Sequence, residues 1–231
     1  MGNTMTASLA EAARDYRWLL DRGYPERGSA TLVGDRRRLD AAERLALYRG
    51  VSSAAASRSR AAKRLGSIGG RILALDAYNA LFLCANRLAG HFILIADDGF
   101  VRDAGGAHGR VADPTRFARA AELVADAVAA ARPARVIAAF DSPVPRSAEH
   151  ARAFAEALAA RGVAAGTELA RSADFAVKTA CLRDGAVAGT GDSALVDSVS
   201  EAWDAGRAAL EALDGSPPPY ADFGKALGAG A

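Results

Sequence analysis

The chain has 231 residues, of which 51% are hydrophobic and 24% charged, and its formal net charge is +2. It is long enough for one well-cored domain with an accessory element and too short for two full enzymes. No apolar run approaches the roughly 18 residues that a transmembrane helix needs, and the N-terminus lacks the basic and apolar regions of a secretory signal. We therefore expect a cytoplasmic protein without a membrane partner.

The charge is distributed unevenly along the chain. Residues 1–70 contain 13 Lys and Arg against 7 Asp and Glu, a net charge of +6, which leaves −4 for the remainder. Such asymmetry is typical of a basic element that binds a polyanion, and equally of a solvated helical face. The two cysteines, Cys84 and Cys181, lie far apart in apolar surroundings and are expected to be core thiols rather than a disulfide or metal pair.

The N-terminal region is predicted to be basic and mainly helical. Apolar spacing predicts a helix over residues 6–23, and residues 30–33 are interpreted as a short extended piece. Asp40 is expected to cap a second helix, with Glu43 completing a capping box. Three consecutive arginines precede that helix. Because guanidinium groups match phosphates, we expect these residues to contact nucleic acid: Arg36, Arg37 and Arg38.

From residue 71 onward, strands and helices alternate, which predicts an α/β domain with a mostly parallel sheet and three α/β/α layers. Short apolar runs without alternation are typical of strands that are covered on both faces. They occupy residues 72–75, 92–96, 136–140 and 186–190, and residues 163–169 are predicted to form a further strand. Helical spacing predicts helices over residues 80–88, 115–131, 147–161 and 173–182, and a helix or helix pair over residues 193–213.

These patterns divide the chain into three segments. A serine-, arginine- and glycine-rich stretch up to about residue 70 is interpreted as a helix end and a linker. We therefore expect an N-terminal region over residues 1–68 and an α/β domain over residues 69–214. The proline-rich and small residues of 215–231 predict a flexible tail.

An acid follows most of the buried runs. Asp76, Asp97 with Asp98, Asp141 and Asp192 come after strands, and Asp174 opens a helix just after one. The carboxyl ends of parallel strands share one edge of a sheet, so we expect these acids to meet in one crevice. Several carboxylates together favour a hard cation such as Mg²⁺ or Mn²⁺, which suits phosphodiester hydrolysis. The alternative is that each Asp merely caps the next helix.

Four short motifs occur in a definite order: Asp76-Ala77-Tyr78-Asn79, Phe140-Asp141, Ala173-Asp174 and Thr190-Gly191-Asp192. As an ordered set over about residues 71–200 they resemble the PIN-like ribonuclease superfamily, specifically its NYN branch. That resemblance implies a three-layer sheet and metal-dependent cleavage of RNA. It also implies that Asp76, Asp141, Asp174 and Asp192 form the catalytic and metal-binding cluster, with Asn79 as a polar support.

The sequence departs from the branch pattern at three positions. Ala77 and Gly191 replace a usual Gly and Ser, and Lys178 stands one helical turn after Asp174, where related nucleases carry a carboxylate. Lys178 either pairs with Asp174 or contacts the scissile phosphate. The stretches RDYRWLLDRGYP and DGFVRDAGGAHG are also similar to an uncharacterised prokaryotic group with a DUF434-type domain followed by a PIN-like half.

Residues 97–110 lie outside this nuclease pattern. Their acids and glycines predict either a mobile lid or a hairpin turn at Asp98-Gly99, and the turn is favoured. Asp97, Asp98 and Asp197 are secondary site candidates. His108, the histidine in polar and glycine-rich surroundings, is a candidate general acid.

Two functions from different classes follow from these patterns. The first is a metal-dependent ribonuclease that binds RNA through its basic helices. The second is a non-catalytic RNA-binding module on a degenerate nuclease scaffold, and a small-molecule phosphatase or nucleotide hydrolase is a third alternative. The sequence leaves open whether the chain forms a homodimer.

Overall fold

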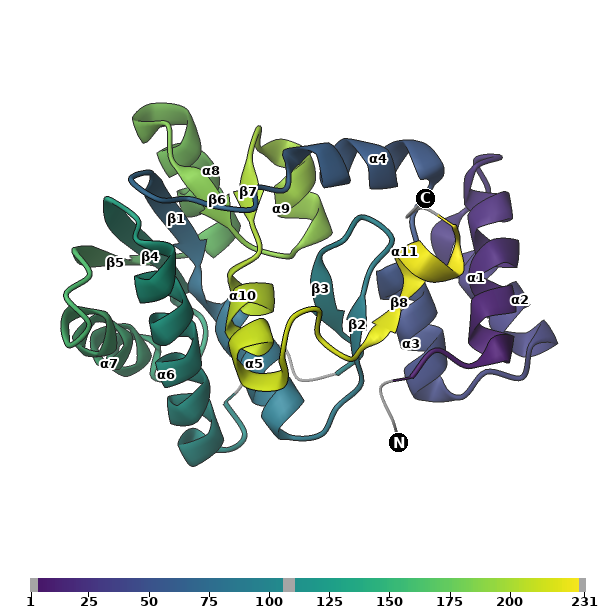
Figure 1. Ribbon diagram of the computed structural model, residues 1–231, viewed down its shortest axis with the longest axis horizontal. Coiled ribbons are helices and arrows are strands. Elements are labelled where there is room, and N and C mark those ends of the chain that lie inside the picture. Colours follow the sequence, from purple (N-terminus) through teal and green to yellow (C-terminus); the bar gives the residue numbers. More distant parts are fainter. Residues whose placement is uncertain (1–3, 106–110, 229–231) are drawn as a thin grey trace. The chain divides into compact units, whose positions relative to one another are not determined.

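The structure is a computed structural model that describes residues 4–105 and 111–228 (Figure 1). The chain divides into two compact units, each built from separated segments. Unit 1 comprises residues 1–62, 90–106 and 219–231, and unit 2 comprises residues 63–89 and 107–218. Within the described ranges, no helix is both long and apolar enough to cross a membrane.

Unit 2 is an α/β unit with a five-stranded, fully parallel sheet in the order β5-β4-β1-β6-β7 (Figure 1). Its elements are β1 (Ile72–Asp76), α5 (Ala77–Leu88), α6 (Pro114–Ala131), β4 (Arg135–Asp141), α7 (Ser147–Ala159), β5 (Ala165–Ala170), α8 (Ala173–Asp184), β6 (Val187–Gly189), α9 (Ser193–Ser198), β7 (Ala202–Trp203) and α10 (Ala205–Asp214).

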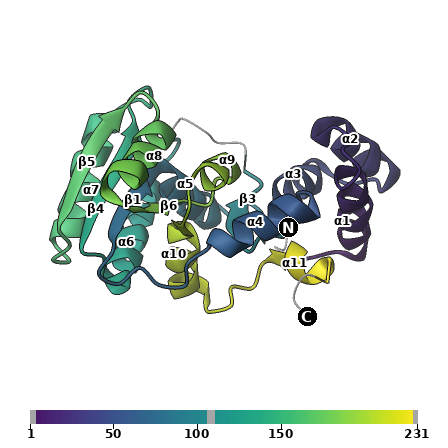
Figure 2. The same cartoon turned by 90° about the horizontal axis from the view of Figure 1, so that it is seen from above.

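The strand order places helices on both faces of this sheet (Figure 2). The chain moves from β1 to β4 to β5 in one direction and returns to β6 and β7 in the other, so right-handed crossovers put the connecting helices on opposite faces. Accordingly α6 packs against α5, α7 and α10, whereas α8 packs on β1, β4, β5 and β6. The predicted three-layer α/β/α arrangement is confirmed. The direction changes between β1 and β6, the kind of switch point where ligands bind in such sheets.

The predicted helix starts in unit 2 have identifiable causes. Asp113 caps α6 by accepting a hydrogen bond from the backbone N–H of Arg116, and Pro114 takes the first helical position, where its missing N–H costs nothing. Helix α7 begins at Ser147, as the predicted helix over residues 147–161 does, and Arg146 in the left-handed region precedes it. The last predicted helix is interrupted by β7, so α9 and α10 are separate.

Unit 1 combines helices with a small sheet in the order β3-β2-β8, where β2 pairs antiparallel with β3 and parallel with β8. Its elements are α1 (Ala7–Leu20), α2 (Glu26–Arg36), α3 (Ala41–Gly50), α4 (Ala54–Lys63, the last residue belonging to unit 2), β2 (Ile93–Ile95), β3 (Val101–Asp103), β8 (Ala221–Asp222) and α11 (Phe223–Ala226).

The N-terminal predictions hold in part. Thr6 caps α1, and Asp40 with Glu43 forms the expected capping box of α3. The prediction of an extended piece at residues 30–33 is wrong, because these residues lie inside α2. Pro25 directly precedes this helix, and Val33 is on its buried face. A fixed φ at Pro25 favours a helix start directly after it, and four apolar residues are too few to distinguish a strand from a helix.

Residues 92–96 were expected to join the main parallel sheet, and that expectation is wrong. They form β2, which belongs to the small sheet of unit 1. The predicted hairpin turn at Asp98-Gly99 is confirmed. The antiparallel strands β2 and β3 are joined by a turn in which the backbone N–H of Gly99 donates to the carbonyl of Ala96 over 2.9 Å. A buried three-residue strand carries no signal for its partner, because pairing is decided by chain segments far away in sequence.

The sequence predicts a flexible tail from Gly215, whereas the structure contains β8 and α11 there. Phe223 is fully buried in the core of unit 1, together with Leu9, Tyr16 and Leu47. The apolar residues that follow the three prolines therefore return the chain to unit 1 instead of leaving it in solvent.

Replacing Phe223 by Ala is expected to lower the free energy of unfolding by about 3 to 5 kcal/mol, because the change removes a fully buried ring and leaves a cavity. Urea unfolding followed by circular dichroism measures the change. Phe175→Ala is the matched control, since that ring is 72% exposed and its loss should change stability by less than about 0.5 kcal/mol. Equal effects of the two substitutions would show that the tail does not contribute to the core.

Candidate active site

The carboxyl edge of the main sheet gathers polar side chains from four segments. Asp76 ends β1 and Asp141 ends β4, whereas Asp192 precedes α9 and Asp174 lies in the first turn of α8. Asp76 and Asp141 end strands whose last apolar residues are buried, and Asp192 follows the buried strand β6, whereas Asp174 follows β5, whose residues are mostly exposed. The parallel register aligns Asp76 with Ala139 of β4, two residues before Asp141.

Asp76 is the most buried of the four, with a relative exposure of 6%. Burial, followed by the charges of Asp174, Asp141 and Asp192, raises the pKa of Asp76 to about 8, although the backbone N–H of Asn79 opposes this shift. The pKa of Asp174 is also raised, by burial and by Asp192 and Asp141. The structure therefore brings these four carboxyl groups within electrostatic range of one another, and among the described residues no arginine or lysine forms an ion pair with Asp76.

A network of hydrogen bonds ties the end of β1 to the segment that follows β6. Asp76 accepts from the backbone N–H of Asn79 (3.3 Å) and from the hydroxyl of Thr190 (3.4 Å). Thr190, which is almost fully buried, accepts from the backbone N–H of Asp192 (3.1 Å), and Asn79 accepts from that of Gly191 (2.9 Å). Asn79 and Thr190 thus hold residues 190–192 against Asp76. Thr190 was not among the predicted site residues, although its position before Gly191-Asp192 was noted as part of a motif.

Three of the four carboxylates, those of Asp76, Asp141 and Asp192, accept hydrogen bonds from backbone N–H groups at helix starts. One oxygen of Asp76 bonds to Asn79, one oxygen of Asp141 accepts from the backbone N–H of Ala173 (2.8 Å), and one oxygen of Asp192 accepts from those of Ala194 and Leu195. These caps use only the Oδ1 atoms. The second oxygens of Asp141 and Asp192 are not used in them.

The side-chain oxygens of this site match a divalent cation in their chemistry but not in their present arrangement. Several carboxylates with a hydroxyl and an amide are the oxygen donors that Mg²⁺ or Mn²⁺ prefers. Across residues 4–105 and 111–228, however, no three Asp, Glu, His or Cys side chains converge closely enough to hold a metal ion as they stand. The donor chemistry fits a hard cation, while the arrangement is that of helix caps which an ion would have to draw together.

Helix α8 adds two exposed side chains next to Asp174. Phe175 is 72% exposed, whereas Ala173, Ala176 and Val177 on the same helix are buried. In the sequence, Phe175 does not share the helical spacing of the apolar residues that form the buried face of α8. This mismatch is the signal that could have identified Phe175 as a site candidate. Lys178 is exposed too, and among the described residues no ion pair joins it to Asp174, which was the first of two alternatives for this side chain.

Asp97 and Asp98 lie in unit 1, and both bind arginines. Asp97 accepts from the backbone N–H of Ser52 (2.6 Å) and from the guanidinium of Arg17 (2.5 Å). Asp98 forms a two-pronged ion pair with Arg102 at 2.8 and 3.1 Å. These contacts are typical of buried structural ion pairs, and they result from β2 joining the small sheet.

The remaining candidates fall in different places. His108 lies outside the described residues. Asp197 is exposed on α9, and its backbone carbonyl accepts from Lys63 (2.9 Å). His150 contacts the hydroxyl of Tyr78 through Nδ1 at 2.9 Å and packs against Phe117. The Tyr78 ring lies directly after Asp76-Ala77, so this aromatic cluster supports the start of α5.

Of the three consecutive arginines, Arg37 is the most engaged. It binds Asp15 through Nε (2.9 Å) and Nη2 (2.7 Å), and it also binds Glu11. Arg36 ends α2, and Arg38 follows with a left-handed φ of 53°. Arg36 and Arg38 are exposed, so their guanidinium groups face solvent.

Comparisons with known proteins identify two families. The profile of a family described as a domain of unknown function (DUF5616) matches residues 65–208, a segment that contains all four aspartates. A second profile, described as a protein of unknown function (DUF434), matches residues 8–63. A relative, the uncharacterised protein MJ0935 of Methanocaldococcus jannaschii, is 26% identical over 105 residues, 45% of this chain and 50% of that protein. The chain thus spans about half the length of this relative. No solved structure matches.

Proposed function

The chain belongs to the family described as a domain of unknown function (DUF5616), and we propose that it is a ribonuclease that depends on Mg²⁺ or Mn²⁺. The observation that carries this proposal is the electrostatic coupling of Asp76, Asp141, Asp174 and Asp192 at the carboxyl edge of one parallel sheet. The resemblance of the surrounding motifs to the PIN-like superfamily, and to its NYN branch, supports the same reaction. RNA is the proposed substrate.

The charge of Asp76 is the central element of this proposal. A buried carboxyl group with a pKa of about 8 holds a proton at neutral pH, and a bound cation would replace that proton. A divalent ion supplies the polarisation of a phosphoryl oxygen and eases the ionisation of water. The chain's part is to present Asp141, Asp174 and Asp192 around Asp76, with Asn79 and Thr190 fixing residues 190–192.

Side chains near the aspartates are suited to binding the substrate. Phe175 offers a face on which a base can stack, and Lys178 offers a charge for a phosphate one helical turn from Asp174. Arg36 and Arg38 of unit 1 are further proposed phosphate contacts. A single-stranded substrate fits best, because stacking on an exposed ring requires an unpaired base.

The proposal is tested by cleavage of mixed RNA by the purified chain with Mn²⁺ and with EDTA. We expect cleavage only with Mn²⁺, and a rate reduced at least about 100-fold in Asp141→Asn, because one charged group of the cluster is lost. Asp126→Asn is the matched control, since Asp126 pairs with Arg161 on the surface of the same unit. Equal rates in the original chain and in Asp141→Asn would assign the cleavage to a contaminating nuclease.

A second function, a non-catalytic RNA-binding module, is favoured by one specific observation. Asp76, Asp141 and Asp192 accept hydrogen bonds from backbone N–H groups at helix starts, and none of the described residues form a ready metal-binding group. The two functions differ in their response to Mn²⁺. A nuclease is expected to be thermally stabilised by Mn²⁺, whereas salt-sensitive RNA binding with neither turnover nor stabilisation would identify the binding module.

A further inference from the structure

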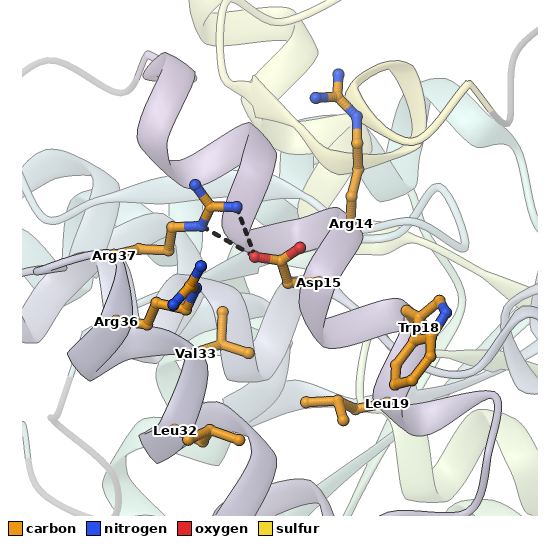
Figure 3. A pocket seen from close by; sticks show the side chains of 8 residues that line it. All are labelled: Arg14, Asp15, Trp18, Leu19, Leu32, Val33, Arg36 and Arg37. Carbon is orange, nitrogen blue, oxygen red and sulfur yellow. Dashed lines mark hydrogen bonds and ion pairs between the residues drawn. The ribbon is translucent and has the colours of Figure 1, made fainter.

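A pocket of about 540 Å³ lies between α1 and α2 of unit 1 (Figure 3). None of the residues that line it belongs to the predicted catalytic set of unit 2. Its volume falls within the range of about 300 to 1,000 Å³ that is common for small-molecule sites. The apolar part of its lining comes from Trp18, Leu19, Leu32 and Val33, and its polar part comes from arginines and Asp15. Every lining residue lies in the first 37 residues.

Two apolar side chains that line this pocket are exposed. Trp18 is 53% exposed and Leu32 is 62% exposed, whereas Val33 is buried. In Figure 3, the Trp18 ring of α1 lies on one side, Arg36 of α2 lies on the other, and Leu19 and Val33 lie between them. Exposed apolar side chains that lie together with cations are typical of a binding surface.

One face of the Trp18 indole is already covered. The guanidinium carbon of Arg22 lies 3.7 Å from the ring centroid, and the Arg22 side chain also donates to the backbone carbonyl of Trp18. Because Arg22 does not line the pocket, the indole face that it covers is not the one that the pocket uses. The other face is therefore available for stacking, and the cation behind the ring holds the ring in place.

The charge of the lining identifies the ligand class. Arg37 is neutralised by Asp15 and Glu11, whereas Arg14 and Arg36 form no ion pair with any described residue. In Figure 3 the Arg14 side chain points away from Arg36, so the pocket presents the uncompensated guanidinium group of Arg36 beside its apolar floor and its aromatic side chain. A nucleotide has the complementary parts, an apolar base that stacks and an anionic phosphate that guanidinium groups bind.

We infer that this pocket binds one nucleotide of single-stranded RNA, with the base stacked on Trp18 and the phosphate held by Arg36. The inference rests on the proposed function only in taking RNA as the ligand, and it adds a subsite that the aspartate cluster does not contain. A base paired in a duplex cannot enter the pocket, so the subsite selects unpaired RNA.

The test uses the emission of Trp18 in the full chain. The other tryptophan, Trp203, is buried in unit 2, so a Trp203→Phe background leaves Trp18 as the reporter. The probes, all in EDTA to prevent metal-dependent cleavage, are a single-stranded oligoribonucleotide of about eight nucleotides, a duplex of the same sequence, and inorganic phosphate. We expect the single strand to quench the emission strongly, and the duplex and phosphate to leave it nearly unchanged.

Substitutions then connect the signal to affinity. Trp18→Ala and Arg36→Ala are each expected to weaken binding of a labelled single strand about 10-fold, in the range of one lost stacked base or phosphate contact. Arg27→Ala is the matched control, because Arg27 is an exposed arginine of α2 that does not line the pocket. Thermal unfolding of each variant verifies that it is folded.

Three outcomes would overturn the inference. These are unchanged affinity in both pocket variants, equal quenching by duplex and single strand, and quenching by phosphate alone, which would indicate a simple anion site. Binding of RNA without quenching of the Trp18 emission would also overturn the inference, because the RNA would then bind at another site and the exposed pocket would fit a protein partner instead. Failure of the proposed function is separate: binding that depends on Trp18 without any Mn²⁺-dependent cleavage would overturn the nuclease and leave the subsite intact.

Discussion

Asp76→Asn is expected to lower the rate of Mn²⁺-dependent RNA cleavage by at least about 100-fold, with little change in RNA affinity. The amide preserves the shape of the side chain and can still accept a hydrogen bond from the backbone N–H of Asn79. It cannot carry the negative charge with which the buried carboxylate would bind a cation. Single-turnover cleavage with enzyme in excess measures the rate, and anisotropy of labelled RNA in EDTA measures the affinity.

The same substitution should change how stability depends on pH. The pKa of Asp76 rises from an unfolded value near 3.9 to about 8 in the folded chain, so the folded state binds more protons over this window. Its contribution to the free energy of unfolding is therefore fully present below about pH 4 and is lost as pH rises toward 8. Without this ionisation, Asp76→Asn should lose less stability between pH 5 and pH 8 than the original chain.

Urea unfolding in EDTA at pH 5, 6.5 and 8 measures this difference, and Asp126→Asn again serves as the control. Added Mn²⁺ should stabilise the original chain more at pH 8 than at pH 5, because protons and the cation compete for Asp76. An Asp76→Asn chain that cleaves RNA at the original rate would remove Asp76 from the mechanism. A pH profile parallel to that of the original chain would show that Asp76 is not protonated at neutral pH.

Arg17→Met is expected to lower the free energy of unfolding by about 3 to 5 kcal/mol at neutral pH, because the substitution removes one partner of a buried ion pair. The carboxylate of Asp97 has a side-chain exposure of 1%, and Arg17 is its cationic partner at 2.5 Å. Burial already raises the pKa of Asp97 despite Arg17 and the N–H of Ser52. Without Arg17, a nearly buried charge would lose its cation.

The loss should grow with pH. Removing Arg17 raises the folded-state pKa of Asp97 further, so the loss of stability is smallest at acid pH and increases as pH rises above the unfolded pKa of Asp97. Arg116→Met is the control, because Arg116 and Asp113 form an ion pair with both side chains 40% exposed, and such pairs contribute about 0 to 1 kcal/mol.

Urea unfolding of both variants at pH 4 and pH 7 provides the comparison. An Arg17→Met chain as stable as the control at pH 7 would contradict a structural role for the Asp97 ion pair. In that case Asp97 would return as a candidate for the chemistry, and Asp97→Asn should be tested for RNA cleavage.

Much of this architecture could be predicted from local sequence patterns. The apolar runs of β1, β4 and β6 end in Asp76, Asp141 and the Thr190-Gly191-Asp192 segment, and right-handed parallel connections place such ends on one edge. Helix starts were also readable, since the side chains of Asp40 and Asp113 cap the nearest backbone N–H groups. These features depend on neighbours within a few residues, or on a rule of chirality that holds for any chain.

Other features were decided only by tertiary structure. β2 has three buried residues, and nothing in them distinguishes the main sheet from the small one, so the arginine partners of Asp97 and Asp98 could not be anticipated. Phe223 packs beside residues more than 170 positions earlier in the chain, which made its segment look like a free tail. The raised pKa of Asp76 likewise exists only after folding, because three distant carboxylates must surround it and water must leave. The sequence by itself determined which residues end the strands, while long-range packing decided which of those ends meet and what each carboxylate binds.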